Sequence, residues 1–160
     1  MKILLSLHFI LFSVTIFAAP VYYRDSSGRI SGTAINSGNR TIYRDRTGKR
    51  IGSSTQSGNR TIYRDASGKI TGTAIQNGDR TIYRDSHGSR TGTVTTNGNQ
   101  TVYRDQTGKV IGRSRPVSSN RTVYRDQTGK LIGSVTNSHD SGTTRDGFSH
   151  VQQQDDPSPR

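Results

Sequence analysis

A 20-residue repeat built around the tripeptide Tyr-Arg-Asp constrains this chain more than any other feature. The tripeptide recurs with its Tyr at positions 23, 43, 63, 83, 103 and 124, and a typical unit reads YRDSSGRISGTAINSGNRTI. Thr144-Arg145-Asp146 marks a degraded seventh copy. Self-similarity at a fixed short period is typical of repeat proteins, in which each unit is one small supersecondary element. The unit is therefore the level at which the fold must be predicted.

Each unit contains two turn signals about half a period apart. The first is Asp-x-x-Gly, as in residues 25–28, where the Asp side chain caps a turn and Gly accepts a positive φ. The second is Ser-Gly or Asn-Gly, as at Asn77-Gly78, which is a strong signal for a two-residue hairpin turn. Stretches rich in Thr, Ile, Val and Tyr lie between the turns, and none has a helical period. One unit thus predicts one β-hairpin with strands of about five residues.

The predicted fold class is all-β, with tandem 20-residue β-hairpin repeats that form a solenoid or an extended meander. A single hairpin is marginally stable in water, so we expect neighbouring hairpins to stabilise one another. The glycine that recurs within the second strand of each unit, as at Gly32 and Gly52, predicts a bend or a close backbone approach. In unit five, Pro116 and one extra residue predict a kink or a break in the stack.

The two ends of the sequence differ from the repeats in composition. Residues 1–18 read as a signal peptide, because Lys2 precedes a mostly apolar stretch too short to span a bilayer, with cleavage expected after Ala18. A retained N-terminal membrane anchor is the alternative. Residues 19–136 hold the six repeats, and the polar residues 137–160 form a tail that we expect to be disordered. The sequence therefore predicts a secreted protein, periplasmic or extracellular.

A second periodicity emerges when the units are compared. Seven residues after the Tyr, units one and three carry Ile30 and Ile70, whereas units two and four carry Arg50 and Arg90. One interpretation is a 40-residue super-repeat in which alternate hairpins turn an apolar face toward a shared seam. The other is drift after duplication.

The segments Asp25-Ser26-Ser27-Gly28-Arg29-Ile30 and Asp126-Gln127-Thr128-Gly129-Lys130-Leu131 resemble the YD repeats of bacterial RHS-type exported proteins. That resemblance covers roughly residues 22–135 and implies β-hairpins that wind into a shell or spiral. Here an Arg separates Tyr from Asp, and the 160 residues contain neither the large polypeptide nor the toxin segment that accompany RHS shells. The spacing is also similar to the 20-residue choline-binding repeats, but the chain has no Trp for their aromatic cage, so choline binding is not carried over.

Charge is the most distinctive chemical feature of the chain. Lys and Arg number 23 against 11 acidic residues, giving a net charge of +12, so polyanions are the expected partners. In stacked hairpins, equivalent side chains would form cationic rows that contact successive phosphates, sulfates or uronates, with the Tyr residues as stacking surfaces for sugars or bases. A purely structural role for Tyr, Arg and Asp is the alternative. The candidate polyanion-binding residues are Arg24, Arg44, Arg64, Arg84, Arg104 and Arg125, with Arg40, Arg60, Arg80 and Arg121.

Little in the chain suggests catalysis. The sequence has no Cys, which excludes a disulfide, a thiolate metal site and a cysteine nucleophile. The only histidines beyond the leader are His87, His139 and His150, and there is no Glu that could pair with them in acid–base catalysis. His87 occupies an Asp-x-x-Gly loop position. Asn39, Asn59, Asn99 and Asn120 begin Asn-x-Thr sequons, which turn chemistry explains more simply than glycosylation. We expect no cofactor and no metal.

These observations predict a secreted, non-catalytic repeat protein. It would act as an interaction module whose Arg and Lys rows bind an acidic surface: acidic polysaccharide, lipopolysaccharide, nucleic acid or a partner protein. The alternatives are a structural component of the cell envelope or extracellular matrix, with self-association through repeat faces, and a secreted effector carrier. Salt separates binding from assembly, because polyanion binding weakens steeply as ionic strength rises.

Overall fold

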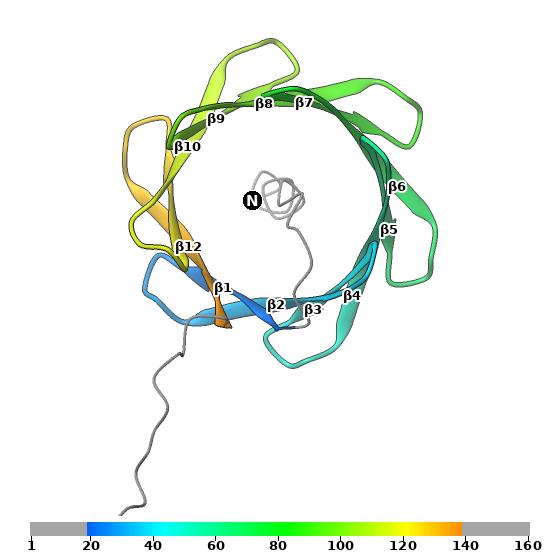
Figure 1. Ribbon diagram of the computed structural model, residues 1–160, viewed down its shortest axis with the longest axis horizontal. Coiled ribbons are helices and arrows are strands. Elements are labelled where there is room, and N and C mark those ends of the chain that lie inside the picture. The colour runs from blue at the N-terminus through cyan, green and yellow to red at the C-terminus, as the bar shows by residue number, and fades with distance from the viewer. Residues whose placement is uncertain (1–18, 139–160) are drawn as a thin grey trace, which may run out of the picture.

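A computed structural model describes residues 19–138 as twelve antiparallel strands that close into a barrel (Figure 1). Consecutive strands are neighbours throughout, and the first strand pairs with the last. The strands are β1 (Val21–Asp25), β2 (Ile30–Ser37), β3 (Arg40–Asp45), β4 (Arg50–Ser57), β5 (Arg60–Asp65), β6 (Ile70–Asn77), β7 (Arg80–Asp85), β8 (Arg90–Asn97), β9 (Gln100–Asp105), β10 (Val110–Pro116), β11 (Arg121–Asp126) and β12 (Leu131–Asn137).

The Asp-x-x-Gly segments form the predicted hairpin loops. In the loop between β3 and β4, the Gly48 amide donates to the Asp45 carbonyl at 3.0 Å, and the Asp45 amide donates to the Lys49 carbonyl at 2.9 Å. Gly48 has a φ of +86°, which a residue with a Cβ adopts only at a cost. The same backbone bonds recur in the other five loops. The sequence signal and the loop conformation therefore agree in every unit.

The second turn of each unit is displaced by one residue from its predicted place. Ser37 pairs with Arg40 and Asn77 pairs with Arg80, so the two central residues are Gly38-Asn39 and Gly78-Asp79. Gly occupies the first central position with a φ near +57° at both turns. Asn and Asp tolerate positive φ better than other residues that carry a Cβ, which suits them to the second position.

Closure of the barrel corrects the prediction of a solenoid or an extended meander. β1 pairs with β12 over five residues, from Val21 opposite Asn137 to Asp25 opposite Gly133. The Ser138 hydroxyl also donates to the Pro20 carbonyl at 2.7 Å. Each hairpin lies edge to edge with the next in one sheet, whereas a solenoid would stack them on one another. Because a closed sheet has no edge strand, every strand has a hydrogen-bonded neighbour on both sides.

The recurring strand glycine lets two strands approach closely, as its position predicts. A Cβ on Gly72 would lie 2.5 Å from the Arg84 carbonyl oxygen, so a larger residue would push β6 and β7 apart. A register shift between Tyr63 and Arg64 marks a β-bulge at the same level of the sheet. Bulges bend a hairpin, and the Asp-x-x-Gly loops project outward beyond the ring of strands (Figure 1).

The Tyr of each unit packs on the inside of the barrel. Tyr63 lies between Gly72 on one neighbouring strand and Ser54 on the other, and Tyr83 lies between Gly92 and Ala74 in the same way. Small residues on both sides leave room for each ring. Val21, Ala34 and Val135 form a buried cluster against which Tyr23, Tyr43 and Tyr124 pack. The core is thus a thin inner layer, as the low apolar content requires.

The apolar seam of the proposed super-repeat is absent. Ile30 and Ile70 are 41% and 39% exposed, so these residues do not face a shared interior. The reason is the closed sheet, whose interior is filled by the Tyr layer.

Pro116 does not break the fold. It is the last residue of β10, where it lies opposite Thr122 of β11. The extra residue is absorbed in the turn at 117–120, where the Val117 amide donates to the Arg121 carbonyl. A proline at a strand end costs little, because the ladder ends there.

The predicted leader at 1–18 and most of the predicted tail lie outside the described residues. Within residues 19–138, no helix is long and apolar enough to cross a membrane.

Candidate functional site

Six of the predicted arginines form a belt around the outside of the barrel, which we call the Arg girdle: Arg24, Arg44, Arg64, Arg84, Arg104 and Arg125. Each follows an inward-facing Tyr, and side chains alternate across a strand, so the girdle faces outward. Each donates from Nη1 to the carbonyl of the Gly four residues later, for example Arg44 to Gly48 at 2.8 Å. The expected rows along a solenoid axis are therefore replaced by a ring.

The girdle bonds fix each guanidinium beside its own loop without neutralising it. A guanidinium carries five N–H donors, and a single bond to Gly48 uses one of those on Arg44. The others retain the fork geometry that suits phosphate, sulfate or carboxylate oxygens. Holding the side chain in place in advance lowers the entropy cost of binding an anion.

The loop carboxylates are committed to the loops themselves. The Thr47 hydroxyl donates to Asp45 Oδ1 at 2.6 Å, and the backbone amides of Thr47 and Lys49 donate to it at 2.8 and 3.1 Å. The hydroxyl bond, with these amides, holds the pKa of Asp45 below its usual value. Hydroxyl and amide bonds lower the pKa in the same way at Asp25, Asp65, Asp105 and Asp126. These Asp residues therefore stay ionised as loop caps.

Positive charge exceeds negative charge in all six Asp-x-x-Gly hairpins. Each hairpin carries one loop Asp and its girdle Arg, and in all but the fourth a Lys or Arg also follows the loop Gly. The second hairpin adds Arg50, and the fourth adds Arg90. We call the end of the barrel that carries these hairpins the loop end. Arg90 reaches across to the next hairpin and donates to the Gln106 carbonyl at 2.6 Å. The loop end is thus a ring of outward-projecting basic hairpins.

Like charges lie directly opposite each other in two hairpins. Arg44 pairs with Arg50, and Arg84 pairs with Arg90, at the positions where other hairpins place an aliphatic residue opposite the girdle Arg. Arg50 donates from Nη2 to Ser53 Oγ at 3.2 Å, while its Nε is buried without a hydrogen-bond partner. These pairs concentrate positive charge on the second and fourth hairpins.

The other predicted arginines lie at the opposite end of the barrel, near the two-residue turns. We call them the rim arginines: Arg40, Arg60, Arg80 and Arg121. All four are exposed and begin odd-numbered strands. Gln100 takes the equivalent position in β9, so the ring is interrupted there. The structure therefore separates the ten predicted residues into two belts at different heights.

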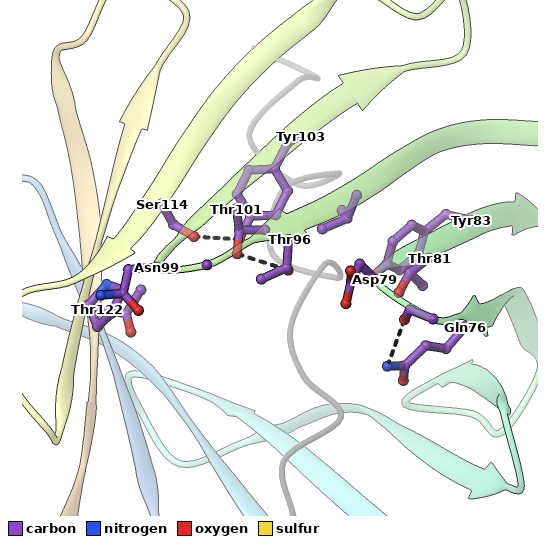
Figure 2. Close-up of a pocket in the computed structure, with 14 residues that line it drawn as sticks. Gln76, Asp79, Thr81, Tyr83, Thr96, Asn99, Thr101, Tyr103, Ser114 and Thr122 are labelled. Atoms are coloured by element: carbon purple, nitrogen blue, oxygen red, sulfur yellow. Dashed lines mark hydrogen bonds between the residues drawn. The ribbon is translucent and has the colours of Figure 1, made fainter.

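A hollow opens at this turn end of the barrel and was not predicted from the sequence (Figure 2). Its volume is about 460 Å³, and residues of β6 to β11 line it. Thr81, Thr101 and Thr96 contribute hydroxyls, Gln76 and Asn99 contribute amides, and Tyr83 and Tyr103 contribute rings. Among residues 19–138, no Lys or Arg lines it, and Asp79 is its one charged residue. The outside of the barrel is strongly basic, whereas this hollow is polar and nearly uncharged.

The Tyr rings form a layer deeper in the barrel. The ring centroids of Tyr63 and Tyr83 are 6.5 Å apart, and those of Tyr103 and Tyr124 are 6.1 Å apart. Burial raises the pKa of the Tyr83 and Tyr103 phenols, so both keep their protons. The Tyr103 hydroxyl shares a hydrogen bond with Ser114 Oγ at 2.9 Å.

The remaining predictions concern single residues. His87 is an exposed loop residue whose amide donates to Asp85 Oδ1, as its position in the loop suggests. Within residues 19–138 no cluster of three or more His, Asp or similar ligands could hold a metal ion. Asn39, Asn59 and Asn99 lie in the exposed two-residue turns, and Asn120 lies in the irregular turn before β11.

No protein-family model matches the chain, and no curated protein matches it either.

Proposed function

We propose that this protein is a secreted, non-catalytic binding module that attaches to polyanions through the outside of its barrel. The observation that carries the proposal is the Arg girdle, in which every guanidinium is held in place by a loop carbonyl while the neighbouring Asp is committed to loop amides. Between residues 19 and 138, 20 Lys and Arg side chains accompany seven Asp. Such an excess attracts phosphate, sulfate or carboxylate polymers over long range.

The loop end is the side we assign to this contact. Its hairpins project outward (Figure 1), and each carries a net positive charge, so a polymer or an acidic surface would meet several of them at once. Simultaneous contacts with repeated weak sites raise the overall affinity far above that of one site. The rim arginines form a thinner ring that Gln100 interrupts.

Self-assembly receives less support than binding. A polymer of hairpin repeats would grow most readily by pairing exposed strand edges, and the pairing of β1 with β12 removes those edges. An assembly component would have to associate through the outer faces of the barrel, where the excess of like charge opposes contact between copies.

Two variants that each lose four positive charges from opposite ends test the assignment. The loop-end variant carries Lys49→Gln, Lys69→Gln, Lys109→Gln and Lys130→Gln, and the rim variant carries Arg40→Gln, Arg60→Gln, Arg80→Gln and Arg121→Gln. Both have the same net charge, so a difference between them reports position. We expect the loop-end variant to elute from immobilised heparin at clearly lower salt and to bind soluble heparin at least about tenfold more weakly than the rim variant.

The wild-type protein should bind heparin at low ionic strength and lose affinity steeply as salt increases. Absence of retention at low salt would overturn polyanion binding altogether. Equal losses in the two variants would show that net charge alone governs the contact, without a defined binding end. Salt-insensitive self-association of the unmodified protein would instead favour an assembly component.

A further inference from the structure

The hollow at the turn end has the dimensions and the boundaries of a ligand site. Its volume of about 460 Å³ lies within the range of roughly 300–1,000 Å³ that is typical of small-molecule sites. It sits inside a closed sheet, so the groups that line it are held by strands on both sides and are positioned before any ligand arrives. Figure 2 shows them arranged along several neighbouring strands.

The lining excludes two classes of ligand. Anions would lack a cationic partner, because no Lys or Arg of the described strands and turns lines the hollow, and Asp79 would repel them. A purely apolar ligand would bury the Thr81 and Thr101 hydroxyls and the Gln76 amide with part of their hydrogen-bonding capacity unused, which costs free energy for each group. The remaining class is a neutral molecule with many hydrogen-bonding groups.

The lining offers both donors and acceptors. A hydroxyl donates one hydrogen bond and accepts two, and an amide provides an NH₂ donor and a carbonyl acceptor. Thr96 and Thr101 share one hydrogen bond at 3.2 Å, and Gln76 Nε2 donates to the Gly78 carbonyl at 3.4 Å, so the Gln76 carbonyl oxygen remains available. The Thr81 and Thr122 hydroxyls add further donors and acceptors to the lining. Ligand hydroxyls could bond to these groups.

Tyr83 and Tyr103 add aromatic surface to the same wall. A pyranose ring has hydroxyls around its edge and C–H groups on its faces, which matches polar side chains combined with aromatic rings. From this combination we propose that the turn end of the barrel binds a short neutral saccharide.

This site is independent of the polyanion contact, because it lies inside the barrel and contains none of the arginines or lysines assigned to that function. Saccharide binding should therefore be insensitive to salt, whereas heparin binding should depend on it. Failure of one proposal leaves the other standing, and the two sets of variants do not share a residue.

The protein supplies its own reporter for the test. It has no Trp and seven Tyr, of which six form the inner layer, so its ultraviolet emission reports mainly on the inside of the barrel. The full chain would be titrated with glucose, N-acetylglucosamine, maltose and cellobiose at concentrations up to about 20 mM, followed by Tyr emission and by calorimetry. We expect at least one of these sugars to bind with a dissociation constant in the millimolar range or tighter and to change the Tyr emission.

A matched pair of double variants locates the site. Thr81→Val with Thr101→Val removes two inward hydroxyls while preserving shape, and Thr55→Val with Thr95→Val makes the same change on the outer face. The inner variant should weaken binding by roughly tenfold, since each lost hydrogen bond costs about 0.5–1.5 kcal/mol, and the outer variant should bind like the wild type. Absence of binding by every sugar, or equal affinity in the inner variant and the wild type, would overturn the proposal.

Discussion

At the scale of single residues, one carboxylate organises each hairpin loop. Asp45 Oδ1 accepts hydrogen bonds from the Thr47 hydroxyl and from two backbone amides, and nearly the same set recurs at Asp25, Asp105 and Asp126. These bonds are strongest to the ionised form, because a protonated carboxyl is a poorer acceptor. Five of the six loops thus depend on the charge of their Asp.

We predict that acid weakens the barrel through these loops. The pKa of Asp45 is lower in the folded protein than its unfolded value of about 3.9. The ionised carboxylate therefore stabilises the fold above about pH 3.9, and this stabilisation is lost as the pH falls through the folded-state pKa. Asp45→Asn cannot ionise, so it should be less stable than the wild type at neutral pH, and the difference in Tm should shrink on acidification. Thermal unfolding followed by circular dichroism from about pH 7 to 2 measures this difference.

Asp79→Asn is the matched control. The other three regular two-residue turns carry Asn39, Asn59 and Asn99 at the position of Asp79, so this substitution should leave the Tm nearly unchanged at neutral pH. A difference between wild type and Asp45→Asn that stayed constant down to pH 2 would show that ionisation of the loop carboxylate does not contribute to stability.

At the scale of the hairpin, the second and fourth units differ from the other four in what they place opposite the girdle. Ile70 lies opposite Arg64, whereas Arg50 lies opposite Arg44. Like charges directly across two antiparallel strands oppose the pairing. The buried, unpartnered Nε of Arg50 adds a further cost. Such a pair weakens the fold locally and increases the positive charge of the loop end, as a binding function would require.

Arg50→Ile should therefore stabilise the protein. The substitution gives the second hairpin the residue found in the first and third, and we expect the free energy of unfolding to rise by about 0.5–1 kcal/mol. The lost bond from Arg50 to Ser53 offsets only part of this gain, because at 3.2 Å between a guanidinium and a hydroxyl it is long. Urea denaturation at low and high salt measures the effect, which should decrease as salt screens the pair.

Arg60→Ile provides the comparison. Arg60 lies opposite Ser57 and Ile75, so its removal takes away one positive charge without relieving a like-charge pair. If Arg50→Ile instead destabilised the barrel, the contacts of its guanidinium would outweigh the repulsion. Equal gains in both variants would mean that overall charge, and not the pair, limits stability.

Hairpin structure could be predicted because its signals are local. Asp45 and Gly48 determine their loop within four residues, and Asn77-Gly78 indicated a tight turn, although its centre lies one residue later, at Gly78-Asp79. Alternation with Tyr explains the outward placement of the girdle Arg side chains, but the repeat predicted rows along a stack and not a ring. The hollow could not be predicted, because Gln76, Thr101 and Ser114 come together only when separate hairpins curve around a common axis.

At the scale of the whole molecule, the described strands β1 to β12 close into a ring without a separate capping unit among them. The sequence of a unit fixes the hairpin but not the angle between successive hairpins, so solenoid and barrel were equally compatible with the repeat. One feature that distinguishes them is capping: solenoids need terminal units with a polar outer face. Here β12 keeps the Leu131-Ile132-Gly133 pattern of internal units and pairs with β1 as those units pair with one another.

A disulfide between the first and last strands tests this closure. Tyr22 and Thr136 are Cα partners across β1 and β12, and the chain has no Cys of its own to compete. In the Tyr22→Cys, Thr136→Cys variant we expect spontaneous oxidation to an intramolecular bond and a gain of about 2–4 kcal/mol in the free energy of unfolding, because the bond closes a loop of more than 100 residues. Electrophoresis without reductant and denaturation with and without reductant measure both effects.

The control replaces the second partner with Thr73 on β6, several strands away from β1 in the order of the sheet. Disulfides form only between residues whose Cα atoms lie within about 7 Å, so Tyr22→Cys with Thr73→Cys should remain reduced within one molecule. In an open array of hairpins, residues 22 and 136 would lie at opposite ends, and the first variant would behave like this control. Dimers cross-linked through Tyr22→Cys and Thr136→Cys would indicate end-to-end pairing between copies in place of closure.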